Sequence, residues 1–145
     1  MADIKRKAQA QWVGNLRKGQ GSISTESGIM RSEHYSFGTR FEQKPGTNPE
    51  ELIAAAHAAC YSMAFSLTLS EKGYTPQSIA TEATCFLTKK EEGFAITKMV
   101  LEVEGEVPDL DEETFKQIAE EADQGCPVSN PLREGLTIEL HAKLK

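Results

Sequence analysis

The feature that most constrains the fold is a long apolar stretch near the middle of the chain. Residues 52–69 form a run of 18 positions without Asp, Glu, Lys or Arg. Signals for a helix start precede it: Thr47 or Asn48 as a cap, Pro49 in the first turn, and Glu50 and Glu51 at the positive end of the helix dipole. Gly73 can end such a helix. We therefore predict one helix over residues 49–72, about 36 Å long.

This run reaches the length at which a membrane-spanning helix must be considered. However, it is rich in alanine, contains His57 and several hydroxyl side chains, and has acidic residues before it and Glu71 and Lys72 after it. A helix that is apolar on nearly all sides is also typical of the centre of a soluble protein. We interpret it as a buried central helix and expect no membrane association.

Size and charge limit the function classes further. The chain has 145 residues, which fits a single domain covering residues 1–145. The formal net charge of −6, without a Lys/Arg cluster beyond short pairs, argues against binding to nucleic acid or anionic membranes. No apolar stretch follows the basic N-terminal residues, so we expect no secretory signal. Three cysteines then favour a reducing cytoplasm with free thiols.

The remaining pattern predicts an α+β fold in which antiparallel strands pack on two helices. The expected elements are strands within residues 8–27, a loop at 28–33, a short strand at 35–41, two strands at 79–89 and 94–107 joined by a hairpin loop at 90–93, a second helix at 112–124 capped by Asp111, a short turn or helix at 131–135, and a final strand at 136–142.

Two cysteines lie in very different settings. Cys60 lies inside the apolar helix, whereas Cys126 follows Gly125 and precedes Pro127. This predicts one thiol held by packing and a second thiol presented on a turn, which suits an attacking thiol and a thiol that resolves its sulfenic acid. The alternatives are a small buried core residue and an exposed loop thiol. Cys85, in the middle of a predicted strand, is interpreted as a core residue.

A reactive thiol needs a positive charge or a hydrogen-bond donor that lowers its pKa. Arg40, between two phenylalanines, is the candidate, although a solvated strand arginine fits equally well; Glu50 or Glu51 could hold its guanidinium. Glu50 and Cys60 are separated by about 15 Å along one helix. Either Glu50 acts only through Arg40, or a two-fold dimer with antiparallel helices brings it to the partner's thiol.

His57 precedes Cys60 by one helical turn, so a Cys–His nucleophile pair is conceivable. We favour a packed or hydrogen-bonded core histidine, because no third group that could orient the imidazole is apparent. Metal binding fits less well, since the sequence contains no C-x-x-C motif and its histidines and cysteines lack zinc spacing.

Together these motifs resemble the OsmC/Ohr family of organic hydroperoxide reductases, and details place the chain closer to the OsmC (osmotically inducible protein C) branch. The likeness extends over nearly the whole chain. It rests on Gly46-Thr47-Asn48-Pro49-Glu50-Glu51-Leu52, His57-Ala58-Ala59-Cys60, Gly125-Cys126-Pro127-Val128-Ser129, Gln11-Trp12, Ser24-Thr25-Glu26-Ser27-Gly28, Phe41-Glu42 and Gly93-Phe94-Ala95-Ile96-Thr97-Lys98.

The resemblance implies an OsmC-like, intertwined α+β homodimer in which antiparallel sheets pack on long central helices and the active sites lie at the subunit interface. It implies an antioxidant peroxidase that reduces organic hydroperoxides to alcohols without a metal or organic cofactor. Cys60 matches the peroxidatic cysteine, Cys126 the resolving cysteine, Arg40 the arginine that activates the thiolate, and Glu50 its partner. A dithiol, lipoyl-linked in the Ohr branch, would reopen the Cys60–Cys126 disulfide, and Met63 and Phe65 would favour organic peroxides.

Two other classes of function use the same cysteines. A redox sensor would form the disulfide stoichiometrically, without turnover, and a partner would read the oxidised form. A ligand-binding dimer would leave both cysteines inert. Steady-state turnover of a peroxide with a dithiol distinguishes all three.

Overall fold

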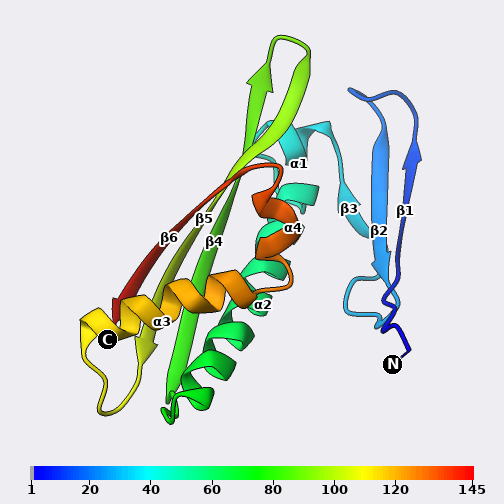
Figure 1. Cartoon of the computed structure of the whole chain (residues 1–145). Helices are drawn as coiled ribbons and strands as arrows, with labels where there is room; N and C mark the ends of the chain where they lie inside the picture. The colour runs from blue at the N-terminus through cyan, green and yellow to red at the C-terminus, as the bar shows by residue number, and fades with distance from the viewer. Residues whose placement is uncertain (1) are drawn as a thin grey trace. The chain divides into compact units, whose positions relative to one another are not determined.

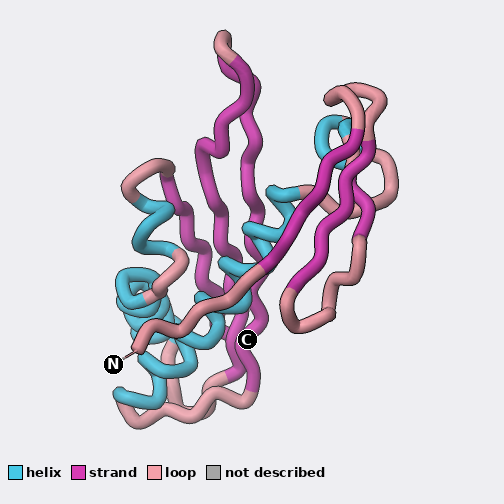
Figure 2. Tube along the Cα trace, turned by 90° about the vertical axis from the view of Figure 1, so that its right-hand side faces the viewer, coloured by secondary structure: helices cyan, strands magenta, loops and turns pink. Residues whose placement is uncertain are grey.

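The computed structural model describes residues 2–145, and the chain divides into two compact units, Met1–Leu52 and Ile53–Lys145. Each unit contains one three-stranded sheet, whose strands run side by side in Figures 1 and 2.

The first unit is built on an antiparallel sheet of β1 (Ala8–Val13), β2 (Gln20–Thr25) and β3 (Glu33–Tyr35), in that order. The predicted strands within residues 8–27 are thereby confirmed. The rings of Trp12 and Tyr35 pack with centroids 5.4 Å apart. Gly21 lies under both rings, and a Cβ atom there would collide with them. The absence of a side chain at this position therefore allows the two rings to pack on the sheet.

A short helix, α1 (Phe37–Phe41), follows β3 where the sequence predicted a strand, so that prediction was wrong. The cause is a capping box: Thr39 N–H donates to Ser36 Oγ at 3.3 Å, and Ser36 N–H donates to Thr39 Oγ1 at 2.9 Å. These two bonds satisfy backbone groups that a strand would pair with a neighbour. Arg40 consequently lies in a helical turn.

The long helix α2 (Pro49–Glu71) confirms the helix that the apolar run predicted. Asn48 Oδ1 caps it by accepting a hydrogen bond from Glu51 N–H at 2.8 Å. Gly73 beyond its end has a φ of 88°, which a residue with a side chain rarely adopts. The first turn of α2 belongs to the first unit, and the rest belongs to the second.

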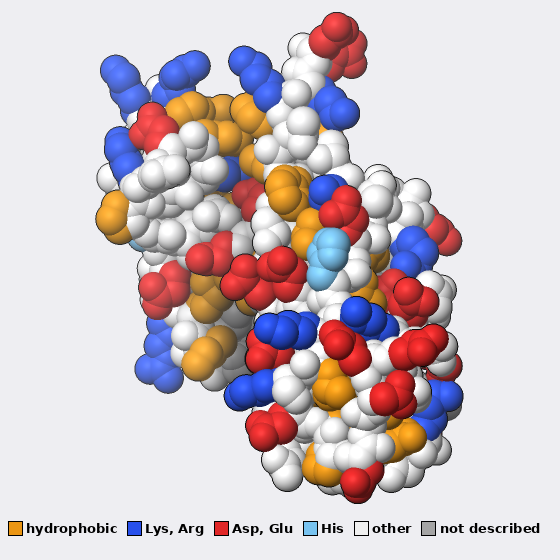
Figure 3. Space-filling model, turned by 90° about the vertical axis from the view of Figure 1, so that its left-hand side faces the viewer, with side chains coloured by type: hydrophobic (Ala, Val, Ile, Leu, Met, Phe, Trp, Pro, Cys, Tyr) orange, Lys and Arg blue, Asp and Glu red, His pale blue; other side chains and the backbone are white. Residues whose placement is uncertain are grey.

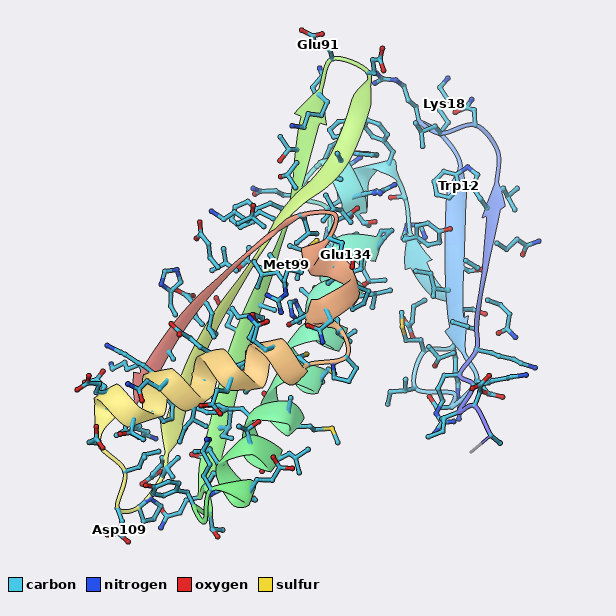
Figure 4. All side chains as sticks on the ribbon, viewed as in Figure 1. Trp12, Lys18, Glu91, Met99, Asp109 and Glu134 are labelled. Carbon is cyan, nitrogen blue, oxygen red and sulfur yellow. The ribbon has the colours of Figure 1, made fainter. Side chains whose placement is uncertain are left out.

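The second unit contains a sheet in the order β4-β5-β6, formed by β4 (Ser78–Lys90), β5 (Gly93–Glu106) and β6 (Thr137–Leu144). β4 and β5 form the predicted antiparallel hairpin, and Glu91 marks its tip in Figure 4. β6, however, pairs with β5 in parallel, which differs from the antiparallel sheet expected from the sequence. Parallel neighbours require a crossover, and here it contains α3 (Glu112–Gly125) and α4 (Ser129–Arg133).

The core of the second unit lies between α2, α3 and the sheet. Phe65 of α2 and Phe115 of α3 meet with ring centroids 5.0 Å apart, and both are fully buried. Asp111 caps α3 as predicted, since its carboxylate accepts a hydrogen bond from Thr114 N–H at 3.0 Å. The buried members of the cluster come from α2, β5, α3 and the segments beside them: Tyr61, Phe65, Leu69, Leu101, Val103, Val107, Leu110, Phe115, Ile118, Ala119, Ala122 and Cys126.

The surface carries charges of both signs. On the face that Figure 3 shows, Lys and Arg side chains alternate with Asp and Glu side chains, and this face has no continuous basic area. Lys98 and Glu139, for example, form an ion pair of 2.9 Å across β5 and β6. This mixture fits the acidic net charge of the chain.

Candidate active site

Two sulfur atoms meet where α2 passes the end of α3. Cys60 projects from α2, and Cys126 follows the last residue of α3. The Cys60 thiol is hydrogen-bonded to the Cys126 side chain and to the backbone N–H of Val128. The three cysteines of the chain are free thiols. The structure therefore brings together the two cysteines that the sequence selected, in their reduced form.

The exposure of these thiols is the reverse of the prediction. Cys126, expected on an exposed turn, has 0% of its surface exposed, whereas Cys60, expected to be held deep in packing, is only half-buried. The turn after α3 folds inward, so that Cys126 joins the core cluster of α2 and α3. Cys60 is consequently the thiol that a substrate can reach.

The surroundings of Cys60 within the second unit disfavour its thiolate. Burial raises the pKa of the Cys60 thiol above its ordinary value, and the Cys126 side chain raises it further. The Val128 N–H acts in the opposite direction, because a donor stabilises the charged sulfur. These groups alone leave Cys60 as a neutral thiol at pH 7.

Residues 126–129, the turn after α3 together with the first residue of α4, are held by several hydrogen bonds, and we call them the thiol loop. Ser129 N–H donates to Cys126 Sγ at 3.5 Å, and Asn130 N–H donates to the Cys126 carbonyl at 3.1 Å. Ser129 Oγ and His57 Nε2 form a hydrogen bond of 2.7 Å. Val128 and Ser129 were not predicted as site residues from the sequence, and only their place beside Cys126 in the family motif could have indicated them.

His57 is a hydrogen-bonded core histidine, as the sequence analysis favoured. Its surface is 0% exposed and its partner is Ser129. Burial lowers the pKa of His57, with Asp123 raising it and Arg133 lowering it to smaller extents. The imidazole is therefore neutral near pH 7. Its Nε2 atom is bonded to Ser129 Oγ, and its buried Nδ1 atom has no hydrogen-bond partner among the described residues.

An ion pair lies beside this histidine. Arg133 Nη1 donates to Asp123 Oδ2 at 2.8 Å, and Arg133 Nη2 donates to the Asp123 carbonyl at 3.0 Å. This pair ties α4 to the end of α3; Figure 4 labels Glu134, which follows α4 directly. Among residues 2–145, the buried side-chain N and O atoms without a hydrogen-bond partner are His57 Nδ1 and Asp123 Oδ1.

The predicted arginine and glutamate pair within the first unit. Arg40 Nη2 donates to Glu50 Oε1 at 2.7 Å, and Arg40 Nε donates to the same carboxylate at 3.1 and 3.3 Å. Glu50, and not Glu51, is thus the partner; Glu51 accepts a hydrogen bond from Thr47 instead. The Arg40 side chain keeps 36% of its surface exposed, so the guanidinium is oriented but accessible.

A small apolar cavity opens beside Arg40. It has a volume of about 140 Å³, and its lining is mostly aromatic and aliphatic, with Ser36 and Arg40 as polar members: Trp12, Leu16, Tyr35, Ser36, Phe37, Arg40 and Phe41. The sequence analysis instead expected Met63 and Phe65 as apolar neighbours of the site. Phe65 cannot serve, because it is 0% exposed within the core, whereas Met63 is 75% exposed on α2.

One face of α2 remains uncovered. Met63 and Leu67, one helical turn apart, are 75% and 60% exposed, and helix α2 is long and apolar enough to cross a membrane by length and composition.

Cys85, expected in the core, is half-buried on β4. No group of three or more potential metal-ligating side chains was found among residues 2–145.

Comparison with known proteins gives the family of this chain. A family model described as OsmC-like protein matches residues 41–141. The chain belongs to the OsmC-like protein family. The matched region contains Glu50, Cys60 and Cys126, and Arg40 lies one residue before it.

Relatives within the family cover nearly the whole chain. Peroxiredoxin OsmC of Escherichia coli (strain K12) is 51% identical over 140 residues, which is 97% of this chain and 98% of that protein. Organic hydroperoxide resistance protein OhrB of Bacillus subtilis (strain 168) is 27% identical over 125 residues, 85% of this chain and 89% of that protein.

Solved structures confirm the predicted OsmC-like α+β fold. The crystal structure of OhrB of Bacillus subtilis matches with a TM-score of 0.71 and 26% identity, over 96% of this chain and 98% of that chain. A structure from Legionella pneumophila, an organic hydroperoxide resistance protein OsmC, matches with a TM-score of 0.75 and 22% identity, over 99% of both chains.

Proposed function

We propose that this protein is a thiol-dependent peroxidase that reduces organic hydroperoxides to alcohols. The observation that carries the proposal is the hydrogen bond between the reduced Cys60 and Cys126 side chains, which places a second thiol beside an accessible first one. The 51% identity to a peroxiredoxin of Escherichia coli supports the same reaction class. Relatives named for organic hydroperoxide resistance support the class of substrate.

The reaction proceeds in three steps. The Cys60 thiolate attacks the distal oxygen of the hydroperoxide; the O–O bond breaks and Cys60 becomes a sulfenic acid. The alkoxide takes up the proton that the Cys60 thiol released on ionisation and departs as the alcohol. The Cys126 thiol then attacks the Cys60 sulfur, which forms the disulfide and releases water. Finally, an external dithiol exchanges with the disulfide, restores both thiols and leaves as its own disulfide.

A second copy of the chain supplies the missing stabilisation of the thiolate. The pKa of Cys60 is raised by groups of its own unit, so a positive charge from elsewhere is needed. Arg40, held by Glu50, supplies this charge from the partner of a homodimer in which the exposed apolar faces of α2 meet. Burying Met63 and Leu67 in this way also removes apolar surface from water.

The apolar part of the substrate has a natural place near Arg40. The cavity there is lined by Trp12, Tyr35 and two phenylalanines, which accept a hydrocarbon group better than a water-like molecule. This lining favours organic hydroperoxides over hydrogen peroxide. The reductant is a dithiol, for which a lipoyl-linked dithiol is our candidate, and the protein works in the cytoplasm, where thiols are normally kept reduced.

The test is steady-state reduction of cumene hydroperoxide with dithiothreitol or dihydrolipoamide as the reductant. Cys60→Ser is expected to abolish turnover, and Cys126→Ser to retain the first oxidation but to accumulate over-oxidised Cys60. Cys85→Ser is the matched control and is expected to retain activity. Turnover by Cys60→Ser at the rate of the parent protein would refute the proposal, and oxidation without turnover in the parent would favour a redox sensor.

A further inference from the structure

The thiol loop is attached to α2 at two points. His57 and Cys60 are three positions apart on the helix, and Cys126 and Ser129 are three positions apart on the loop. The contacts pair them in register: His57 with Ser129 through a hydrogen bond of 2.7 Å, and Cys60 with Cys126 through their thiols. The contact between Cys60 and Cys126 contains the reacting sulfurs, whereas the hydrogen bond between His57 and Ser129 takes no part in the reaction.

The non-reacting attachment is sealed from solvent. His57 and Ser129 are both 0% exposed, and their hydrogen bond joins residues 72 positions apart in the sequence. A buried hydrogen bond of this kind is costly to break, because neither side chain can form a replacement hydrogen bond with water. Ser129, His57 and Asp123 are the residue types of an acyl-transfer triad, but no substrate can reach a hydroxyl that is fully buried.

The position of Ser129 determines where two backbone N–H groups point. Ser129 N–H donates to Cys126 Sγ at 3.5 Å, and the preceding N–H, that of Val128, donates to Cys60 Sγ. Because these amides are consecutive, holding the Ser129 side chain fixes both of them relative to the sulfurs. The Arg133–Asp123 ion pair holds the ends of α3 and α4 on either side of the loop.

We propose that the His57–Ser129 hydrogen bond positions the thiol loop for the condensation of Cys126 with oxidised Cys60, so that both are positioning residues. This inference rests on the proposed peroxidase function. In the condensation, the Cys126 sulfur bonds to the Cys60 sulfur, the S–O bond of the sulfenic acid breaks, and the thiol proton leaves with the hydroxyl as water. Cys126 is oxidised and the sulfenic sulfur is reduced.

The condensation competes with a second attack by peroxide, which converts the sulfenic acid to a sulfinic acid. The condensation is intramolecular, so its rate depends steeply on the distance and alignment of the two sulfurs. The second attack requires a further peroxide molecule and does not require Cys126, so the loop acts on it only through the Val128 N–H at the Cys60 sulfur. Loosening the loop therefore shifts the outcome of each turnover toward sulfinic acid.

The experiment measures the fraction of Cys60 converted to sulfinic acid per turnover, by mass spectrometry, at several cumene hydroperoxide concentrations with dithiothreitol present. His57→Leu and Ser129→Ala remove the bond and are each expected to raise this fraction about tenfold, the factor expected for a lost buried hydrogen bond. His57→Gln places an amide nitrogen where Nε2 lies, so it is expected to keep the sulfinic fraction close to that of the parent protein. Ser129→Ala in the His57→Leu background is expected to add no further effect.

Tyr61→Phe is the matched control. The Tyr61 hydroxyl, on the same helix and equally buried, donates to the Ala119 carbonyl at 2.8 Å, so its loss removes a comparable bond that does not hold the loop. Thermal unfolding of each variant measures the general loss of stability. If His57→Leu does not fold, Ser129→Ala and His57→Gln still test the inference.

An unchanged sulfinic fraction in His57→Leu and Ser129→Ala would overturn the inference, as would an equal rise in Tyr61→Phe. These results are separate from a failure of the proposed function, which would appear as turnover that does not depend on Cys60. A direct measurement of the first oxidation, without reductant, is expected to show a much smaller change in these variants than the sulfinic fraction.

Discussion

The ion pair between Arg40 and Glu50 makes a quantitative prediction about activation of the thiol. Glu50→Gln retains the shape of the side chain but removes the charge that accepts three short contacts from the guanidinium, at 2.7, 3.1 and 3.3 Å. Hydrogen bonds to charged groups contribute about 1.5–3 kcal/mol. The Arg40 side chain is 36% exposed, so solvent screening reduces the loss to about 1–2 kcal/mol for the pair.

If the oriented guanidinium stabilises the Cys60 thiolate, the same loss appears in the transition state. Since about 1.4 kcal/mol corresponds to a tenfold change in rate, kcat/KM for cumene hydroperoxide is expected to fall about tenfold. The pH–rate profile is expected to move to higher pH, because a less effective positive charge leaves the pKa of Cys60 higher. Stopped-flow oxidation of the reduced protein over a range of pH measures both effects.

Glu51→Gln is the matched control for this prediction. Glu51 is exposed, adjacent to Glu50, and bonded to Thr47 rather than to Arg40. The Glu51→Gln substitution removes the same formal charge from the same helix turn and is expected to leave kcat/KM nearly unchanged. Equal losses in Glu50→Gln and Glu51→Gln, or an unchanged pH profile in Glu50→Gln, would refute the assignment of Glu50 as the residue that orients Arg40.

Three further predictions concern assembly and stability. Met63→Glu puts a charge on the exposed apolar face of α2, where Met63 is 75% exposed, and is expected to shift the mass in light scattering from dimer to monomer and to reduce turnover; an unchanged mass would contradict the proposed interface. Gly105→Ala places a methyl group 2.7 Å from Phe115 Cε2 and is expected to lower the free energy of unfolding by about 1–3 kcal/mol in chemical denaturation. Burial lowers the pKa of His57, so the unfolded chain takes up its proton first as the pH falls below about 6.5. The contribution of His57 to stability is therefore complete above that pH and is lost as the pH falls through the native pKa, which unfolding at a series of pH values detects as a slope that His57→Gln lacks.

Local signals made the helices and the hairpin predictable. Asn48 and Gly73 mark the ends of α2, and Asp111 marks the start of α3. The cap bonds of Asn48 and Asp111 join residues three positions apart, and Gly73 acts through its own backbone conformation. The error at α1 has an equally local cause. The Ser36–Thr39 capping box selects a helical turn in a segment whose composition suits a strand, and such a box is easily overlooked without a long apolar pattern behind it.

The parts of the site that could not be predicted depend on contacts between distant segments. Cys60 and Cys126 could be chosen from the motifs, but the burial of Cys126 depends on how α3 packs against α2. The bond between His57 and Ser129 spans 72 positions, and no spacing rule connects them. Phe65, expected beside the substrate, is instead part of the core, where its ring packs against that of Phe115 of α3.

The parallel pairing of β6 with β5 affects how the segment that contains Cys126 is held. Because β5 and β6 run in the same direction, the chain must return to the other end of the sheet after β5 before β6 can begin. Cys126 lies within that return path. The return path is fastened at one end to the central strand and at the other to an edge strand. We expect fraying of β6 to loosen this segment, so that a change at the sheet edge would alter the approach of Cys126 to Cys60 without touching either cysteine.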